Sequence, residues 1–507
     1  MNKPRLLSLA AALWLACLAP LHAQKKYEPT WESIDSRPVP QWFQDAKFGV
    51  FIHWGVYSVP SYIHINREGS VYDCYAEWYE VLAMSKPGPS RQFHDRVYGK
   101  DFAYRDFAPL FRAELWNPDA WAKLFKDAGA KYVILTSKHH DGYALWPSSS
   151  PYAKGWNAVE VGPKRDLVGD LTKSVRDQGL KMGLYFSLIE WESTPTQRAG
   201  NHEGYYLPAA VVNKYKIPAD KMISGHIIPQ MKELVTKYQP AILYPDGDWD
   251  EDYNRLQSLD FLSWLYNNAP NKDEIAVNDR WGQVRGKHGG YYSREYADTE
   301  DVGDEHPWEE IQGMGYSFGY NRNEDIADYR TSEELVHLLV NTVGRGGNLC
   351  LNVGPAADGT IPVIMQQRLL DIGAWLKVNG EAIYGTRTWK NPAEVKKTVA
   401  TAAAAAGEKK EKSAAEAAST RSARTVFYSR KGDALYVLTT EWPKQGLNIA
   451  GLKGDKGLKV SLLGTAKPVS WENRKDGLHL TPPVLSPTEL PARYAYVFRI
   501  DGLGPLK

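Results

Sequence analysis

Short apolar runs alternate with longer amphipathic stretches between about residues 45 and 385. Each run is bounded by polar residues or glycine, which is typical of a buried strand. The runs lie at 48–52, 132–135, 182–186, 241–244, 275–277 and 349–353. Unbroken apolar character, without alternation, predicts strands that are buried on both faces, as in a parallel sheet.

The amphipathic stretches between these runs carry helix start and stop signals. Asn117 and Pro118 predict the beginning of a helix that ends before Gly129. Thr331 and Glu334 form a capping box for a helix that reaches residue 343. Similar patterns occupy 165–178, 225–238 and 259–266. Strand–helix alternation on this scale predicts an α/β fold, a (β/α)8-like TIM barrel over residues 24–390.

The pattern changes twice after the barrel region. Residues 391–424 are dominated by Ala, Lys, Glu, Ser and Thr and supply no core, so they predict a mobile loop or solvated helix without a catalytic role. Residues 425–507 contain short alternating segments at 425–428, 434–438, 458–463 and 494–500. These segments predict a small antiparallel β-sandwich.

The first 23 residues resemble an export signal. Lys3 and Arg5 precede an apolar stretch over 6–18, and Leu21-His22-Ala23 offers a cleavage site. The apolar stretch is too short to remain as a membrane-spanning helix. We therefore expect a secreted or periplasmic protein with no spanning segment after cleavage. Lipid attachment through Cys17 is the less favoured alternative.

Composition narrows the classes of partner. The formal net charge is +1, from 61 basic and 60 acidic side chains, which gives no electrostatic case for binding nucleic acid or a membrane surface. After removal of the signal only Cys74 and Cys350 remain, and we expect two buried thiols rather than a disulfide. Aromatic residues make up 12% of the chain, enough to supply rings for stacking on sugars. The oligomeric state cannot be inferred.

Polar residues follow several of the predicted strands, at the rim where barrel active sites lie. Carboxylates and aromatic rings dominate there, and glycoside hydrolysis needs two carboxyl groups beside an aromatic wall. Asp246, between Tyr244 and Trp249, is a candidate, although Asp246-Gly247 alone also fits a simple turn.

A metal site is the alternative for the same rim, because His53, His139, His140 and Asp246 are all potential ligands. Neighbouring residues on a strand point to opposite faces, so we do not expect His139 and His140 to bind one ion together. The spacing also lacks a common zinc pattern. We therefore expect neither a metal nor another cofactor.

Several segments resemble family 29 of the glycoside hydrolases, the α-L-fucosidases. They are 46–55 (AKFGVFIHWG), 136–142 (TSKHHDG), 278–282 (NDRWG), 317–320 (SFGY) and 346–355 (GGNLCLNVGP). The segments 77–79 (EWY) and 288–292 (HGGYY) are similar to the broad-specificity branch that includes lysosomal-type fucosidases. The resemblance covers residues 27–390 well and the C-terminal region weakly.

The resemblance implies a retaining exo-glycosidase that removes terminal α-L-fucose from an oligosaccharide or a glycoprotein glycan. It makes Asp246 the nucleophile and Glu295 the acid/base, with Glu309 as the rival, both in a stretch that we expect to be irregular. Positions that bind the fucose hydroxyls or flank the ring are His53, Glu77, Trp78, His139, His140, Tyr185, Tyr244 and Arg280, and Phe318 faces the C5 methyl group. Tyr244 departs from the Trp of some family members, which puts stacking there in doubt.

Two other functions stay open on the sequence alone. The first is a non-catalytic fucose-binding protein on the same fold, and the second is a metal-dependent barrel hydrolase. The presence of both carboxylates favours the glycosidase.

Overall fold

Eight parallel strands form the central sheet of the molecule. The computed structural model describes residues 25–193, 207, 209–249, 251–296, 305–391 and 425–504. The strand order is β5-β4-β3-β2-β1-β8-β7-β6, so the strands follow one another in chain order around the sheet. The strands are β1 Phe48–Ile52, β2 Tyr132–Lys138, β3 Lys181–Ser187, β4 Ile242–Asp246, β5 Ala276–Val277, β6 Tyr292–Glu295, β7 Trp308–Gln312 and β8 Asn348–Val353.

The two edge strands of this order, β5 and β6, are joined to each other. A parallel bridge connects Asn278 with Tyr291. Two backbone hydrogen bonds support it, from Gly290 N to Asn278 O (3.1 Å) and from Tyr291 N to Val277 O (3.0 Å). The sheet therefore curls into a TIM-like barrel, as the sequence predicts.

The predicted helices are present, with small shifts at their ends. Asn117 caps α5 (Pro118–Asp127) by accepting a hydrogen bond from Ala120 N, and Thr331 and Glu334 form the capping box of α11 (Ser332–Gly344). The other helices beside the barrel strands are α6 Leu167–Asp177, α9 Ile228–Tyr238, α10 Ser258–Asn268 and α12 Val363–Asn379. The alternation of strands and helices is interrupted in one region, because the described residues between β5 and β6 and between β6 and β7 contain no helix.

Strands β6 and β7 were not predicted from the apolar pattern. Their sequences, YSRE and WEEIQ, are largely polar. Polar side chains on these strands face the barrel interior instead of an apolar layer, so periodicity carries no strand signal there. The expectation that Glu295 and Glu309 lie in an irregular stretch is wrong, because both lie on these strands.

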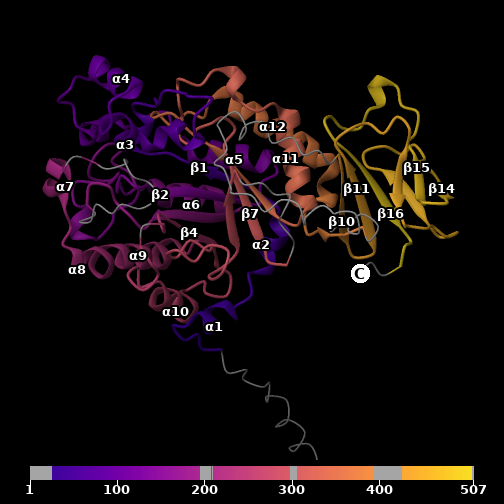
Figure 1. The fold of residues 1–507 in the computed structure, drawn as a ribbon, viewed down its shortest axis with the longest axis horizontal. Coiled ribbons are helices and arrows are strands. Elements are labelled where there is room, and N and C mark those ends of the chain that lie inside the picture. Colours follow the sequence, from indigo (N-terminus) through magenta and orange to yellow (C-terminus); the bar gives the residue numbers. More distant parts are fainter. Residues whose placement is uncertain are drawn as a thin grey trace, which may run out of the picture.

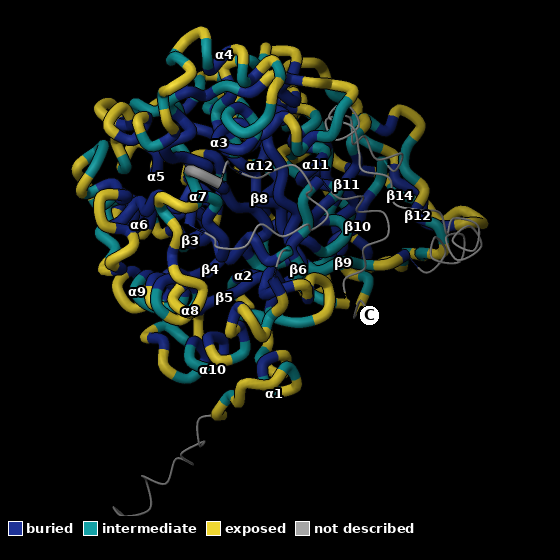
Figure 2. The backbone as a smooth tube through the Cα atoms, turned by 60° about the vertical axis from the view of Figure 1, so that its left-hand side comes forward, coloured by how far each residue is buried: buried dark blue, intermediate teal, exposed yellow. Residues whose placement is uncertain are grey.

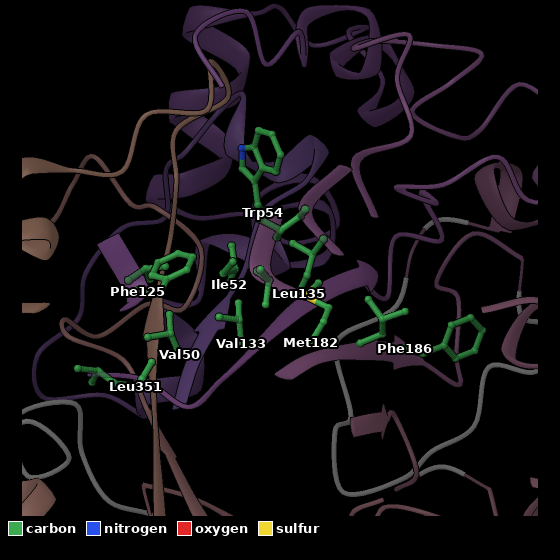
Figure 3. Packing of buried hydrophobic residues seen from close by; sticks show 14 of the residues in the cluster. Val50, Ile52, Trp54, Phe125, Val133, Leu135, Met182, Phe186 and Leu351 are labelled. Carbon is green, nitrogen blue, oxygen red and sulfur yellow. The ribbon is translucent and has the colours of Figure 1, made fainter. Parts of the chain in front are cut away.

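Alternate residues of the barrel strands enter two separate cores. One set faces the surrounding helices, where Val50 and Ile52 of β1 and Val133 of β2 pack toward Phe125 of α5 (Figure 3). The other set fills the barrel and includes Phe51. Figure 2 shows the strands as buried and the exposed residues concentrated on outer helices and loops.

Aromatic rings close the N-terminal end of the barrel. Helix α2 (Gln41–Ala46) precedes β1 and places Phe43 on Tyr291, with ring centroids 4.1 Å apart, and 5.9 Å from Tyr132. We call Phe43, Tyr132 and Tyr291 the floor cluster. All three are at most 1% exposed. The barrel therefore has a packed base beneath the carboxyl ends of its strands.

Two antiparallel sheets follow the barrel, at the right of Figure 1. One has the order β13-β16-β11-β10-β9 and the other β12-β15-β14. Their strands are β9 Arg387–Thr388, β10 Val426–Lys431, β11 Ala434–Thr439, β12 Leu447–Ala450, β13 Lys459–Leu462, β14 Ser470–Arg474, β15 Gly477–Thr481 and β16 Tyr496–Asp501. The predicted antiparallel C-terminal unit is confirmed. The apolar segments in the sequence correspond to strands of the five-stranded sheet, and no predicted segment corresponds to the strands of the three-stranded sheet.

The larger C-terminal sheet packs against the barrel. Trp375 of α12 donates a hydrogen bond to Ala495 O (2.9 Å), and Phe427, Leu438 and Val497 belong to the same core as the barrel helices. Residues 1–23, with Cys17, and 392–424 lie outside the described residues. Cys74 and Cys350 are buried free thiols, as expected. No described helix has the length and apolarity needed to cross a membrane.

Candidate active site

A cavity of about 440 Å³ opens at the carboxyl ends of the barrel strands. The eleven residues that the sequence singles out all line it. They are Asp246, Glu295, His53, Glu77, Trp78, His139, His140, Tyr185, Tyr244, Arg280 and Phe318. Side chains that are up to 265 positions apart in the chain, His53 and Phe318, therefore share one site.

Asp246 is the last residue of β4, and its two carboxylate oxygens have different partners. Oδ1 accepts a hydrogen bond from Arg280 Nη1 (2.6 Å) and a longer one from Arg285 Nη2 (3.4 Å). Oδ2 accepts one from the Tyr185 hydroxyl (3.0 Å) and lies 3.8 Å from His140 Nε2. The next residue, Gly247, has φ +83°, and a Cβ there would lie 2.8 Å from Ile189 Cγ1, so the turn after Asp246 requires glycine.

The charge of Asp246 is fixed by its neighbours. Burial acts to raise its pKa, but the charges of Arg280, His140 and Arg285 together outweigh burial and hold the pKa well below its ordinary value. Asp246 is therefore a carboxylate across the whole physiological range, which is the state that a nucleophile requires.

Glu295, the last residue of β6, faces Asp246 across Arg280. The Tyr75 hydroxyl donates a hydrogen bond to Glu295 Oε1 (2.7 Å), and Arg280 Nη2 lies 3.4 Å from Glu295 Oε2. One guanidinium thus contacts both carboxylates, since its Nη1 is the donor to Asp246.

A residue of β6, Ser293, also binds Arg280. Its Nε donates to Ser293 Oγ (2.9 Å), and the Ser293 hydroxyl donates to Asp279 Oδ1 (2.7 Å). Arg280 is 3% exposed, so these contacts fix the guanidinium in a dry setting between the two acids.

Glu309 lies below the cavity and does not line it. It is 0% exposed, and Tyr132 of the floor cluster donates a hydrogen bond to it. On β7 it shares a face with Ile311, which does line the cavity, and it is about 6.6 Å nearer the N-terminal end of the strand. Burial raises the pKa of Glu309 to about 8, so it is a neutral acid packed in the barrel interior.

His53 and Phe318 form one wall of the site. Their rings are stacked, with centroids 5.0 Å apart at 21°. His53 Nδ1 is 2.6 Å from Asn352 Oδ1, and since an amide oxygen only accepts, Nδ1 carries the proton. Burial lowers the pKa of His53 to about 4, so the ring is neutral and its Nε2 is a potential acceptor.

His139 and His140 both line the cavity, which corrects the expectation that they point to opposite faces. Strand β2 ends at Lys138, and a turn closed by Gly142 N to His139 O (3.0 Å) replaces the alternating strand geometry. The two rings are 4.3 Å apart, and His140 Nδ1 contacts Ser187 Oγ (2.6 Å). Within the described ranges, no three His, Cys, Asp or Glu side chains form a group that could hold a metal.

Glu77 and Trp78 come from the short helix before α3 (Tyr79–Met84). Glu77 Oε2 accepts hydrogen bonds from Gly319 N (2.7 Å) and Ser317 Oγ (3.2 Å), and burial raises its pKa to about 8. Trp78 stacks with Trp249 at 6.3 Å. The pair places indole rings at the cavity mouth.

Tyr185 and Tyr244 supply a layer of rings beneath Asp246. They are stacked at 6.0 Å and 17°, and the Arg280 guanidinium lies 5.2 Å from the Tyr244 ring centre. Tyr244 lines the cavity, its ring lies against the Arg280 guanidinium, and it is only 1% exposed.

Two lining residues that contact the carboxylates were missed in the sequence. Arg285 contacts Asp246 and is anchored through its Nε to Asp248 (3.0 Å), and Tyr75 bonds Glu295. Trp249, which the sequence places beside Asp246, stacks on Trp78. Arg285 lies in a glycine-rich loop rather than at a strand end. Tyr75 lies two residues before the EWY segment, which was the one available signal.

The chain matches proteins of known function along nearly its whole length. The family profile described as Alpha-L-fucosidase matches residues 15–381, and the one described as Alpha-L-fucosidase C-terminal domain matches 420–501. Tissue alpha-L-fucosidase of Bos taurus is 38% identical over 505 residues, covering 98% of this chain and 96% of the relative. That of Homo sapiens is 38% identical over 483 residues, covering 94% and 92%.

Solved structures of fucosidases also align with nearly the whole chain. The Thermotoga maritima alpha-fucosidase in complex with a mechanism based inhibitor aligns with TM-score 0.74 and 36% identity, covering 94% of this chain and 100% of that one. The same enzyme in complex with fucose aligns with TM-score 0.72 and 35% identity, with coverage of 94% and 100%.

Proposed function

Since the chain belongs to the α-L-fucosidase family and is a glycoside hydrolase that acts on fucosyl residues, we propose that it works by double displacement with Asp246 as nucleophile and Glu295 as acid/base. One observation carries this assignment: a single buried guanidinium, that of Arg280, contacts both carboxylates. Both carboxyl groups therefore face one cavity from opposite sides of Arg280, so they can act on the same glycosidic bond, as a retaining pair must.

In the first step Asp246 attacks C1 of the fucosyl residue. Glu295 gives its proton to the glycosidic oxygen, the C1–O bond breaks, and the leaving alcohol departs. A covalent fucosyl ester on Asp246 remains. Arg280 Nη2 and the Tyr75 hydroxyl then stabilise the carboxylate that Glu295 has become.

In the second step Glu295 takes a proton from water, and the oxygen of that water attacks C1. The ester bond breaks, fucose leaves with net retention of configuration, and Asp246 is again a carboxylate beside Arg280. Glu295 ends with the proton that the next cycle needs, so the two steps balance.

The remaining wall residues bind the sugar in this proposal. His53, His139, His140, Glu77 and Arg280 offer fixed polar partners to the three hydroxyls, because fucose needs directed hydrogen bonds in a largely apolar pocket. Phe318 faces the C5 methyl group, Trp78 flanks the ring, and Tyr185 and Tyr244 support the base of the pocket. The natural substrate is a fucosylated oligosaccharide or glycoprotein glycan.

Early product analysis tests the mechanism. The enzyme is mixed with an activated aryl α-L-fucoside, with and without a chelator, and the first released sugar is followed by NMR. We expect α-L-fucose first, at the same rate in both samples. Initial release of β-L-fucose would make Asp246 a base rather than a nucleophile.

We also propose that residues 1–23 direct export to a secreted or periplasmic location. Lys3 and Arg5 before an apolar stretch, followed by Leu21-His22-Ala23, support this. Amino-terminal sequencing of the exported protein should begin at Gln24. A mature chain that begins at Cys17 with an attached lipid would replace this proposal.

A further inference from the structure

Two segments that line the cavity, and a third whose Trp191 packs against them, each carry a buried carboxyl group. Glu80 follows Trp78 by two residues, Asp141 follows His140, and Glu192 follows Trp191. The three carboxyl-bearing residues are 1%, 3% and 3% exposed, respectively. None of them lines the cavity, so the catalytic steps do not use them.

Glu80 and Glu192 lie near one cation, Arg105, and the charge of Asp141 acts on Glu80 from nearby. Arg105 Nε donates to Glu192 Oε2 (2.5 Å), and its guanidinium lies 3.5 Å from the Tyr215 ring centre and 4.3 Å from that of Trp156. Asp141 accepts hydrogen bonds from the Tyr104 hydroxyl (2.7 Å) and from Tyr143 N (3.0 Å). Lys138, the other nearby cation, is bonded to Glu190 (2.6 Å).

Glu80 has the least support of the three. Both of its oxygens are buried, and no donor among the described residues reaches them. Its carboxyl group lies within hydrogen-bonding range of that of Glu192, and two ionised carboxylates offer only acceptors to each other. Burial, with the charges of Glu192 and Asp141, raises the pKa of Glu80 well above its ordinary value, against the weaker opposing effect of Arg105.

We propose that Glu80 is a protonated positioning residue, whose hydroxyl donates to the Glu192 carboxylate and thereby joins the segments that carry Trp78 and Trp191. Two ionised carboxylates, those of Glu80 and Glu192, beside the single guanidinium of Arg105 and close to Asp141 would leave uncompensated buried charge, which is strongly unfavourable. One proton shared by the pair removes the repulsion and supplies a charge-assisted hydrogen bond. We call Glu80, Glu192, Asp141 and Arg105 the carboxyl clasp.

The clasp acts on the sugar site through indole rings. The Trp191 ring packs against Trp78 and against His140, with centroids 5.3 Å from each, and Trp191 N donates to His140 O (2.8 Å). Loss of the proton makes Glu80 and Glu192 repel, which moves Trp191 away from the two cavity residues. The expected result is weaker substrate binding at alkaline pH, before the chemical step itself is lost.

The kinetic test rests on the proposed function and compares Glu80→Gln with the wild-type enzyme. The amide donates to Glu192 at every pH, so KM for an aryl α-L-fucoside should stay flat in Glu80→Gln. In the wild type KM should rise by about 2- to 30-fold through the alkaline range. Glu192→Gln, which also removes one acid, should flatten KM similarly, and the exposed Glu114→Gln should behave as wild type. A rise in KM that is equal in Glu80→Gln and wild type would overturn the proposal.

Thermal unfolding tests the clasp without any substrate, so it remains decisive if the aryl fucoside is not cleaved. Folding raises the pKa of the Glu80 carboxyl group above that of the unfolded chain, which is about 4.3 for glutamate. The folded protein therefore loses stability as the pH rises from the pKa of the unfolded state through the pKa of the folded state. Glu80→Gln lacks that loss. Its Tm, relative to wild type, should therefore increase by about 2–4 °C between acidic and alkaline pH. A parallel pH dependence of Tm in the two proteins would show that Glu80 holds no such proton.

Discussion

Asp246 shows how charge is set at a single residue. It is 8% exposed, a condition that normally favours a neutral carboxyl group, yet the charges of Arg280, His140 and Arg285 keep it ionised. We expect Asp246→Gly to abolish turnover because no neighbouring group can form the covalent intermediate. Circular dichroism should show an intact fold, and azide should restore part of the rate with an activated substrate, giving β-fucosyl azide. Residual wild-type activity would remove Asp246 from the mechanism.

Glu295 and Glu309 are predicted to respond differently to substitution. Glu295→Ala should slow fucosides with poor leaving groups far more than those of acidic phenols, because a general acid matters most for a poor leaving group. Glu309→Gln should keep most of the activity on both, since Glu309 is neutral and its amide replacement preserves the size of the side chain. Steady-state kinetics over a series of aryl fucosides measures both. The opposite pattern would make Glu309 the acid.

Phe318 is expected to recognise the methyl group of fucose. Phe318→Ala should weaken binding of fucose more than of an analogue that lacks the C5 methyl, by about 1 kcal/mol. Calorimetric titration of both sugars measures the difference. Equal losses would mean that the ring only supports His53, on which it stacks.

At this scale the sequence predicted most of the side chains that line the cavity, and their roles stay predictions. Asp246, Arg280 and the histidines could be found because each lies at or just beyond a strand end and belongs to a contiguous segment. Tyr75 and Arg285 could not, because their importance comes from contacts across 220 and 39 positions. The expectation that His139 and His140 point to opposite faces was wrong, because strand β2 ends at Lys138 and alternation does not continue beyond it.

At the scale of elements, apolar periodicity found the strands that separate two apolar layers. It failed for β6 and β7, where Arg294, Glu295 and Glu309 interrupt the apolar pattern. The strands that carry Glu295 and Glu309 are therefore the ones with the weakest strand signal. Helices were easier, because capping residues mark their ends independently of what the helix packs against.

Helix α11 allows a direct test of such a signal. Thr331 Oγ1 accepts from Glu334 N (3.2 Å), and Glu334 Oε2 accepts from Thr331 N (2.9 Å). Thr331→Ala should reduce the free energy of unfolding by about 1 kcal/mol. Thr331→Ser keeps the hydroxyl and should match wild type in thermal or denaturant unfolding. Equal destabilisation by both would show that the methyl group, and not the cap, is what matters.

At the scale of the whole molecule, the C-terminal sheets extend the outer core of the barrel. Strand β9, which precedes residues 392–424, pairs with β10, which follows them, so the two ends of that segment are already held together. Deletion of residues 397–420 should therefore leave kcat and Tm close to wild type, because their composition supplies neither core nor sugar contacts. A large fall in kcat would place this segment at the active-site rim.

The floor cluster has a kinetic consequence. Stacked rings close the base of the barrel, so the opening at the carboxyl ends of the strands is the route for both entry and exit. Substrate and products must therefore use the same opening. In the proposed binding mode the fucosyl group enters first and lies deepest in the cavity, and the rest of the glycan lies in its opening. In the proposed mechanism the released alcohol must leave through this opening before water can reach the ester on Asp246, so free fucose is the last product to leave. Fucose should therefore compete with intact substrate for the empty enzyme, whereas the alcohol should compete with water for the loaded one.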